Sequence, residues 1–239
     1  MSKKPVVIEN QTFWHGECLR LMDFIPDNSI DMVLCDLPYG TTACKWDVII
    51  PFELLWEQYW RVLKPNGAVV LTASQPFTTK LIASQMKHFK YEWIWNKRAS
   101  ANFAVAKYQP LKVHENIVVF GGNYKPQMTT GKMRTKGGKV KAGESAGGLD
   151  AVSYKNDQYY PISLLDFKTQ RGFHPTQKPV ALFEYLIKTY TNEGETVLDN
   201  CSGSGTTAIA AHRTGRKSIC IEQNEEYFIK SVERMRQTR

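Results

Sequence analysis

The chain has 239 residues, of which 42% are hydrophobic and 23% charged, so it is long enough for a globular α/β domain and too apolar to be disordered. Lys and Arg number 31 against 23 Asp and Glu, and the net charge of +8 favours a polyanionic partner. The five cysteines form no Cys-x-x-Cys pair, which argues against a zinc ribbon or a disulfide framework. With no signal peptide and no run of about 18 apolar residues, we expect a cytoplasmic protein without membrane contact.

Residues 1–122 alternate short β-rich runs with helical patterns. The expected strands are 11–15, 31–35, 68–72, 91–95 and 116–120, and the expected helices are 51–63 and 76–89. The first of these helices begins at a proline and is followed by the breaker Lys64-Pro65-Asn66-Gly67.

Residues 123–172 have a different composition. Eight of the 16 glycines lie between Gly121 and Gly148, together with six Lys or Arg and Glu144 as the single acid. Such a segment cannot build a core, so we expect a mobile loop inserted into the α/β frame. It is either a linker without a role or a loop that becomes ordered on a phosphate backbone.

Residues 173–239 return to the alternation. The expected elements are helix 179–190, strand 196–198, helix 206–212, strand 217–221 and helix 226–236. Apolar strands separated by helices indicate a mostly parallel sheet, here of seven strands, with helices on both faces. The two halves of this domain therefore flank the inserted middle region.

A glycine loop follows the strand 196–198. Gly203 and Gly205 let the backbone approach a ligand, but the P-loop pattern is absent and Ala208 stands where a dinucleotide loop has its third glycine. Asp199 at the loop suits a cationic group such as an ammonium. Glu222, at the tip of the next strand, stands where dinucleotide-binding folds grip ribose hydroxyls. An amino-acid end and a nucleoside end together describe S-adenosylmethionine.

The tetrapeptide Asp36-Leu37-Pro38-Tyr39 follows the buried strand 31–35, where open α/β sheets bind ligands. Leu37 is held extended by Pro38, which fixes the direction of its carbonyl. A carboxylate, an oriented carbonyl and an aromatic ring together suit an exocyclic amino group on a planar base. A simple turn after a strand is the alternative.

These motifs resemble those of amino-group DNA methyltransferases of the beta subgroup, in which the order of the motifs is permuted. The motifs that carry the resemblance are Asp36-Leu37-Pro38-Tyr39, His174-Pro175-Thr176-Gln177-Lys178-Pro179, Asn200-Cys201-Ser202-Gly203-Ser204-Gly205-Thr206-Thr207 and His15-Gly16-Glu17-Cys18. The resemblance spans about residues 11–236 and implies a Rossmann-like, S-adenosylmethionine-dependent methyltransferase fold. Leu37 replaces the usual first proline and Cys201 a usual phenylalanine, and neither change implies inactivity.

The resemblance also assigns roles. The methionine part of the cofactor is expected beside Asp199 and the glycine loop, its carboxylate near Thr176 and Lys178, its ribose on Glu222 and its adenine beside Glu17. The residues expected around the cofactor are Glu17, Cys18, Asp36, Thr176, Lys178, Asp199, Cys201, Gly203, Ser204, Gly205, Thr206 and Glu222. The residues expected at the target base are Asp36, Leu37, Pro38 and Tyr39.

The implied reaction is direct displacement of the cofactor methyl group by the amino nitrogen of a flipped base in DNA. Asp36 and the Leu37 carbonyl would accept the two amino hydrogens, and Tyr39 would stack on the base. An Asp-initiated motif favours adenine N6 over cytosine N4. Transfer to cytosine C5 is excluded because no cysteine follows a proline, and zinc deamination is disfavoured because Cys-x-x-Cys is absent.

A non-catalytic nucleic-acid-binding module of the same fold is the remaining alternative. We expect DNA as the partner, a homodimer, a bacterial or phage source and a possible cognate restriction enzyme, with no metal site. The recognition sequence cannot be read from these residues because base contacts depend on the structure.

Overall fold

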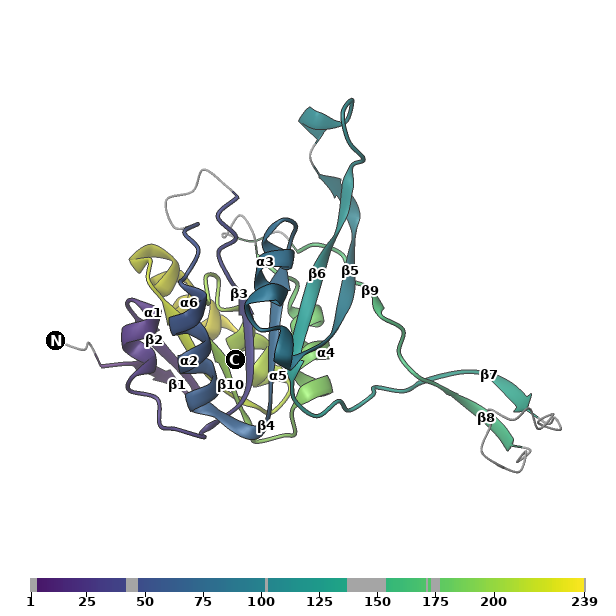
Figure 1. Ribbon diagram of the computed structural model, residues 1–239. Coiled ribbons are helices and arrows are strands. Elements are labelled where there is room, and N and C mark those ends of the chain that lie inside the picture. The colour runs from purple at the N-terminus through teal and green to yellow at the C-terminus, as the bar shows by residue number, and fades with distance from the viewer. Residues whose placement is uncertain are drawn as a thin grey trace. The chain divides into compact units, whose positions relative to one another are not determined.

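The computed structural model describes residues 4–41, 47–101, 103–136, 154–170, 172 and 177–238 (Figure 1). It divides into two units, of which the first contains residues 1–125 and 163–239 and the second contains residues 126–162. In the described residues no helix is long and apolar enough to span a membrane.

Among the described residues of the first unit, nine strands form one sheet in the order β1-β2-β11-β10-β3-β4-β6-β5-β9. Their bounds are β1 (Val6–Ile8), β2 (Gln11–His15), β3 (Ile30–Asp36), β4 (Leu63–Ala73), β5 (Phe89–Ala101), β6 (Lys112–Gly121), β9 (Leu164–Asp166), β10 (Thr196–Asp199) and β11 (Lys217–Glu222). Of these described strands, β1 and β6 alone run opposite to the rest. The sheet is therefore mostly parallel, which confirms the expected fold class.

The seven expected strands are all present, and the number seven was too low. The two additional strands, β1 and β9, have three residues each and lie at the two edges of the sheet. A three-residue strand is too short to show a period-two pattern. The expected breaker at residues 64–67 also lies within β4, where the register with β3 shifts between Ile30 and Met32.

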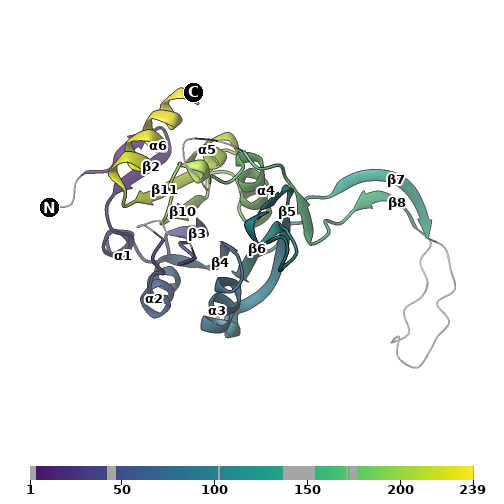
Figure 2. The same ribbon diagram turned by 90° about the horizontal axis from the view of Figure 1, so that it is seen from above.

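The helices cover both faces of the sheet (Figure 2). They are α1 (Cys18–Met22), α2 (Phe52–Val62) and α3 (Phe77–Ser84) on one face, and α4 (Val180–Tyr190), α5 (Thr206–Arg213) and α6 (Glu225–Gln237) on the other. All but α1 were expected, although the expected helix 76–89 was too long, since α3 ends at Ser84 and a separate 3-10 helix covers Met86–His88. The five residues of α1 are too few for a helical period to be visible in the sequence.

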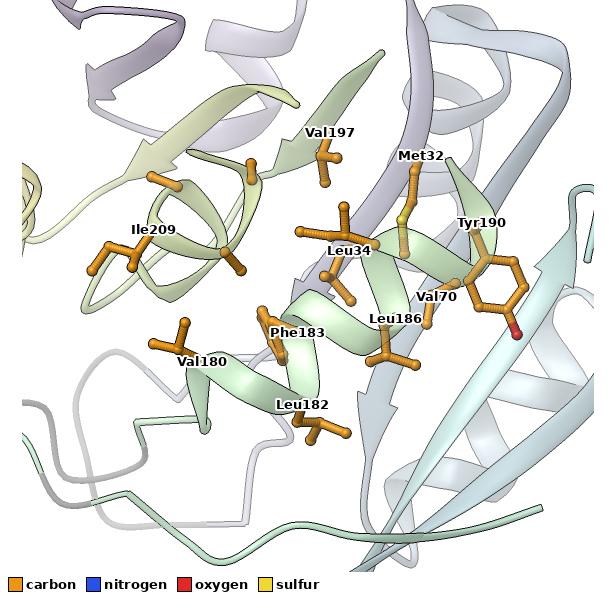
Figure 3. Packing of buried hydrophobic residues seen from close by; sticks show 14 of the residues in the cluster. Met32, Leu34, Val70, Val180, Leu182, Phe183, Leu186, Tyr190, Val197 and Ile209 are labelled. Atoms are coloured by element: carbon orange, nitrogen blue, oxygen red, sulfur yellow. The ribbon is translucent and has the colours of Figure 1, made fainter. Parts of the chain in front are cut away.

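The central strand β3 is buried on both sides, and its side chains alternate between two cores. Met32 and Leu34 pack in the core beneath α4 and α5, and Val33 and Cys35 pack in the core beneath α1, α2 and α3. Figure 3 shows Phe183 and Leu186 of α4 pointing toward the strands on the first side. Because β3 is clamped from both faces, the residue at its carboxyl end, Asp36, is rigidly placed.

The second unit contains a paired element that we did not expect. β7 (Thr129–Lys136) and β8 (Tyr154–Tyr159) form an antiparallel two-stranded sheet, where the sequence predicted a loop. The guanidinium of Arg134 lies 3.6 Å from the ring centroid of Tyr159, and the Tyr159 hydroxyl donates to the Lys132 carbonyl at 2.8 Å. These cross-strand contacts compensate for the glycine content. Of the six basic residues expected to contact phosphates, Lys139 and Lys141 lie outside the described residues.

Candidate active site

Four acidic side chains converge at one edge of the sheet. Asp36 ends β3, Asp199 ends β10, Glu222 ends β11, and Glu17 follows β2 by two residues. These four strands are parallel neighbours, so their carboxyl ends share an edge. A cavity of about 660 Å³ opens there, within the size range of ordinary ligand pockets.

The cavity brings most of the predicted residues together. The predicted residues that line it are Glu17, Cys18, Asp36, Leu37, Pro38, Lys178, Asp199, Cys201, Gly203, Ser204, Thr206 and Glu222. Thr176 and the rest of His174-Pro175-Thr176 lie outside the described residues. The cavity also has an apolar wall formed by Val48, Ile49 and Ile50, and Tyr227 of α6 lines it, and no motif in the sequence pointed to these four residues.

Two predicted residues, Tyr39 and Gly205, are described by the structure but lie outside the cavity lining. The Tyr39 ring stacks on Phe77, with ring centroids 5.2 Å apart, and its hydroxyl donates to Asp36 Oδ1 at 2.9 Å. Burial raises the pKa of Tyr39, so the hydroxyl remains a donor. Because one face of the ring already packs on Phe77, stacking on a base requires the other face and stays a prediction.

The Asp36 carboxylate is held from both sides. Its Oδ1 atom accepts from the hydroxyls of Tyr39 and Thr72, and its Oδ2 atom accepts from Lys178 Nζ at 2.5 Å. Thr72 lies opposite Asp36 in the register of β3 and β4. A carboxylate offers about four lone-pair positions, so this arrangement fixes Asp36 and leaves room for one more donor.

Lys178 belongs to a buried chain of charges that the sequence did not reveal. Its ammonium contacts Asp36 Oδ2 and, at 3.4 Å, Glu115 Oε2, and Glu115 also pairs with Lys97. Burial would lower the pKa of Lys178, but Asp36 and Glu115 together raise it. Burial would likewise raise the pKa of Glu115, and the two lysines together lower it. The structure places the Lys178 ammonium on Asp36 and Glu115 and the residue in the cavity lining, so its expected position near the cofactor carboxylate stays a prediction.

The glycine loop is held by the same carboxylates that were assigned to the ligand. Asp199 Oδ1 accepts from the Cys201 amide at 3.1 Å, and Glu222 Oε2 accepts from the Gly203 amide at 2.7 Å. Gly203 and Gly205 have φ angles of 48° and 71°, which explains the need for glycine at both positions. Burial raises the pKa of the Asp199 carboxyl to about 7 and also raises the pKa of Glu222.

Glu17 has a local role in addition to lining the cavity. It is the N-cap of α1, and its two oxygens accept from the amides of Leu19 and Arg20, each at 2.9 Å. Next to it, Cys18 and Cys201 line the cavity, and the Cys201 thiol lies beside the thiols of Cys18 and Cys35. Cys201 therefore packs against two small thiols, which explains how it fits at a position where the resembling family usually has phenylalanine.

The cavity matches the two ends expected for S-adenosylmethionine. Asp199 is buried, and burial raises its pKa. A cationic group beside it would stabilise the ionised carboxylate. Glu222 ends the neighbouring strand and also lines the cavity, and its contact with the ribose hydroxyls stays a prediction. The apolar wall at residues 48–50 suits a planar ring.

Comparison with known proteins agrees with this geometry. Residues 30–233 match a family described as DNA methylase, so the chain belongs to the family of DNA methylases that act on amino groups, at adenine N6 or cytosine N4. The chain is 30% identical to the DNA adenine methyltransferase YhdJ of Escherichia coli K12, covering 95% of this chain and 83% of that protein.

Two solved structures share the fold. The M1.HpyAVI–SAM complex has a TM-score of 0.65 at 22% identity, covering 94% of this chain and 99% of its own. The PvuII DNA methyltransferase, which is cytosine-N4-specific, has a TM-score of 0.69 at 17% identity, covering 100% and 95%. The Rossmann-like fold is thus confirmed. The family is S-adenosylmethionine-dependent, which confirms the expected cofactor.

Proposed function

We propose that this protein transfers the methyl group of S-adenosylmethionine to adenine N6 in DNA. The observation that carries the proposal is the Asp36 carboxylate, fixed beside the cavity with one acceptor position left for an amino hydrogen. An aspartate at this position favours adenine, and the relative YhdJ is named a DNA adenine methyltransferase. Similarity to a cytosine-N4 enzyme keeps that base as the alternative outcome.

In this proposal Asp36 accepts one amino hydrogen and the Leu37 carbonyl accepts the other. The two contacts localise the nitrogen lone pair, which is otherwise delocalised into the ring. S-adenosylmethionine, when bound, supplies an electrophilic methyl carbon. Lys178 stabilises ionised Asp36, so Asp36 acts as an acceptor and the proton released from nitrogen passes to solvent.

The test is methylation of random-sequence duplex DNA, followed by mass spectrometry of the nucleosides. We expect N6-methyladenosine as the product. N4-methylcytosine would overturn the assignment of adenine, and no methylated nucleoside would overturn the proposed activity. Single-molecule sequencing of the same DNA would give the recognition sequence.

Replacing Glu222 by alanine should raise the cofactor dissociation constant ten- to a hundredfold, because a hydrogen bond to a charged group contributes about 1.5–3 kcal/mol. Calorimetry with S-adenosylmethionine measures this. The loss of affinity caused by Glu222→Ala should be smaller for a 3′-deoxy analogue of the cofactor, which lacks one of the two ribose hydroxyls. Glu233→Ala, on the exposed side of α6, is the control, and equal losses for both ligands would count against a ribose contact.

Cofactor affinity should rise with pH between 6 and 8. The pKa of Asp199 is about 7, so its carboxyl changes from mostly neutral to mostly ionised over this range, and only the ionised form pairs with an ammonium. The expected gain is roughly tenfold, since one pKa unit corresponds to about 1.4 kcal/mol. Asp199→Asn should bind more weakly at pH 8 and show a flatter profile. An unchanged profile in that variant would place the titrating group elsewhere.

Three further expectations stay predictions. DNA-sequence recognition is assigned to residues 123–172 between catalytic and cofactor-binding halves at 1–122 and 173–239. The homodimer would be tested by sedimentation at micromolar concentration, and a mass near 27.3 kDa would contradict it. The cognate restriction enzyme would be sought among the genes next to this one.

A further inference from the structure

Strands β5 and β6 extend well beyond the rest of the sheet (Figure 1). The last residue of β4, Ala73, pairs with Asn116 of β6, which in turn pairs with Ile94 of β5. Beyond that point β5 continues to Ala101, so the hairpin projects roughly 20 Å from the sheet at about 3.3 Å per residue. We call residues 103–110, at its end, the aromatic tip.

The base of this hairpin lies next to the proposed reaction site. β5 runs in the same direction as β3, so the hairpin leaves the sheet at the edge where Asp36 lies. Lys97 of β5 and Glu115 of β6 form the outer end of the buried charge chain, which reaches Asp36 through Lys178. The hairpin is thus tied by ion pairs to the catalytic carboxylate.

The aromatic tip combines exposed rings with positive charge. All of residues 103–110 are exposed, and the side chains of Phe103 and Tyr108 are 67% and 88% exposed. From Lys97 to His114 the sequence contains Lys97, Arg98, Lys107 and Lys112 and no Asp or Glu. The two rings belong to neither hydrophobic core and do not line the cavity. Exposed rings within a purely basic segment are the chemistry of nucleic-acid contact.

We propose that the aromatic tip enters the DNA duplex next to the target base and that Phe103 or Tyr108 stacks between bases as the target leaves the helix. This inference rests on the proposed function and identifies the element that opens the duplex. The hairpin exceeds the depth of either DNA groove, about 8 Å, so its end reaches the base stack. Apolar or aromatic wedges inserted between base steps compensate for the unstacking that extrusion requires.

The test compares the double variant Phe103→Ala/Tyr108→Ala with wild type on two DNA substrates. One is a matched duplex, and in the other the target base lies opposite an abasic site and needs no help to unpair. We expect kcat/KM to fall at least tenfold on the matched duplex and to stay within threefold on the abasic one. Equal losses on both substrates, or no loss on either, would overturn the proposal.

A second readout does not depend on methyl transfer. With 2-aminopurine at the target position and a non-reactive cofactor analogue, wild type should increase the fluorescence as the base leaves the stack. The double variant should not, although it binds the analogue normally. Increased fluorescence in both proteins would exclude the wedge. This measurement separates failure of the wedge from failure of the proposed chemistry, because base extrusion precedes the reaction.

The matched control is Phe24→Ala, which removes a ring that is 61% exposed but stacks on Trp14. It should retain wild-type ratios between the two substrates. Sedimentation of both variants tests the alternative that the aromatic tip binds a second copy of this chain. A change in mass for the double variant, with DNA opening unaffected, would assign the tip to self-association and overturn the proposal.

Discussion

Asp36→Ala is expected to lower the rate of methyl transfer by a factor of about 10² to 10³ or more, the loss seen when a preorganised transition-state contact is removed. Cofactor affinity should stay within a few fold, because Asp36 is assigned to the base and Asp199 and Glu222 to the cofactor. Single-turnover assays and calorimetry separate the two effects. Asp23→Ala, at an exposed carboxylate that contacts Gln58, is the control and should leave both unchanged.

Two results would contradict this role. A near-normal single-turnover rate would show that Asp36 does not contact the amino group. Loss of cofactor binding at full stability would move Asp36 to the cofactor side. Asp36→Asn adds a third comparison, because it keeps an acceptor oxygen but removes the charge that pairs with Lys178.

Lys178→Met is expected to lower the free energy of unfolding by about 3–5 kcal/mol, the usual cost of removing one partner from a buried ion pair. The Lys178 side chain is 7% exposed, and its ammonium lies between Asp36 and Glu115, which would be left facing each other without a cation between them. The substitution removes one of the two lysines that lower the pKa of Glu115 against the effect of burial, so this pKa should rise in the folded state. When the pKa of an acid is raised in the folded state, the free energy of unfolding decreases as the pH increases and the acid ionises. The loss of unfolding free energy in Lys178→Met should therefore be larger at pH 8 than at pH 5.

Urea titration at both pH values measures the effect. The double variant Lys178→Met/Glu115→Gln should recover part of the stability, because it removes the repulsion between the Glu115 and Asp36 carboxylates. Lys230→Met, which breaks an exposed pair with Glu226, serves as the control and should cause no measurable change. A loss at Lys178 as small as that of the control, or no recovery in the double variant, would show that the buried chain does not stabilise the fold.

The strands that hold the site could be predicted because each is a run of buried apolar residues ending in an acid. Asp36, Asp199 and Glu222 were placed correctly at one sheet edge for that reason. The hydrogen bonds of those acids could not be predicted. Asp199 and Glu222 each accept from a backbone amide of the glycine loop, and such a hydrogen bond depends on the loop conformation.

Glu115 and Thr72 were missed, although each left a signal. Glu115 is an acid directly before the expected strand 116–120, and a buried charge requires a partner. Thr72 ends the expected strand 68–72, but its contact with Asp36 depends on strand order and register, which the pattern of residues does not determine. The contacts of Lys178 with Asp36 and Glu115 were not predicted, because they depend on how the chain returns to the sheet after the insertion.

The second unit leaves and rejoins the first at two anchored points. The Lys125 amide donates to the Thr189 carbonyl at the end of α4, and the Ser163 carbonyl accepts from the Ile94 amide of β5. Doubling the length of a loop closed at fixed ends costs only about 0.6 kcal/mol. The inserted segment can therefore be lengthened, shortened or exchanged during evolution. The strand pairings that form the cavity would stay the same. Under the proposed assignment of DNA-sequence recognition to residues 123–172, a change in the recognised sequence would then require no change in the residues proposed for methyl transfer.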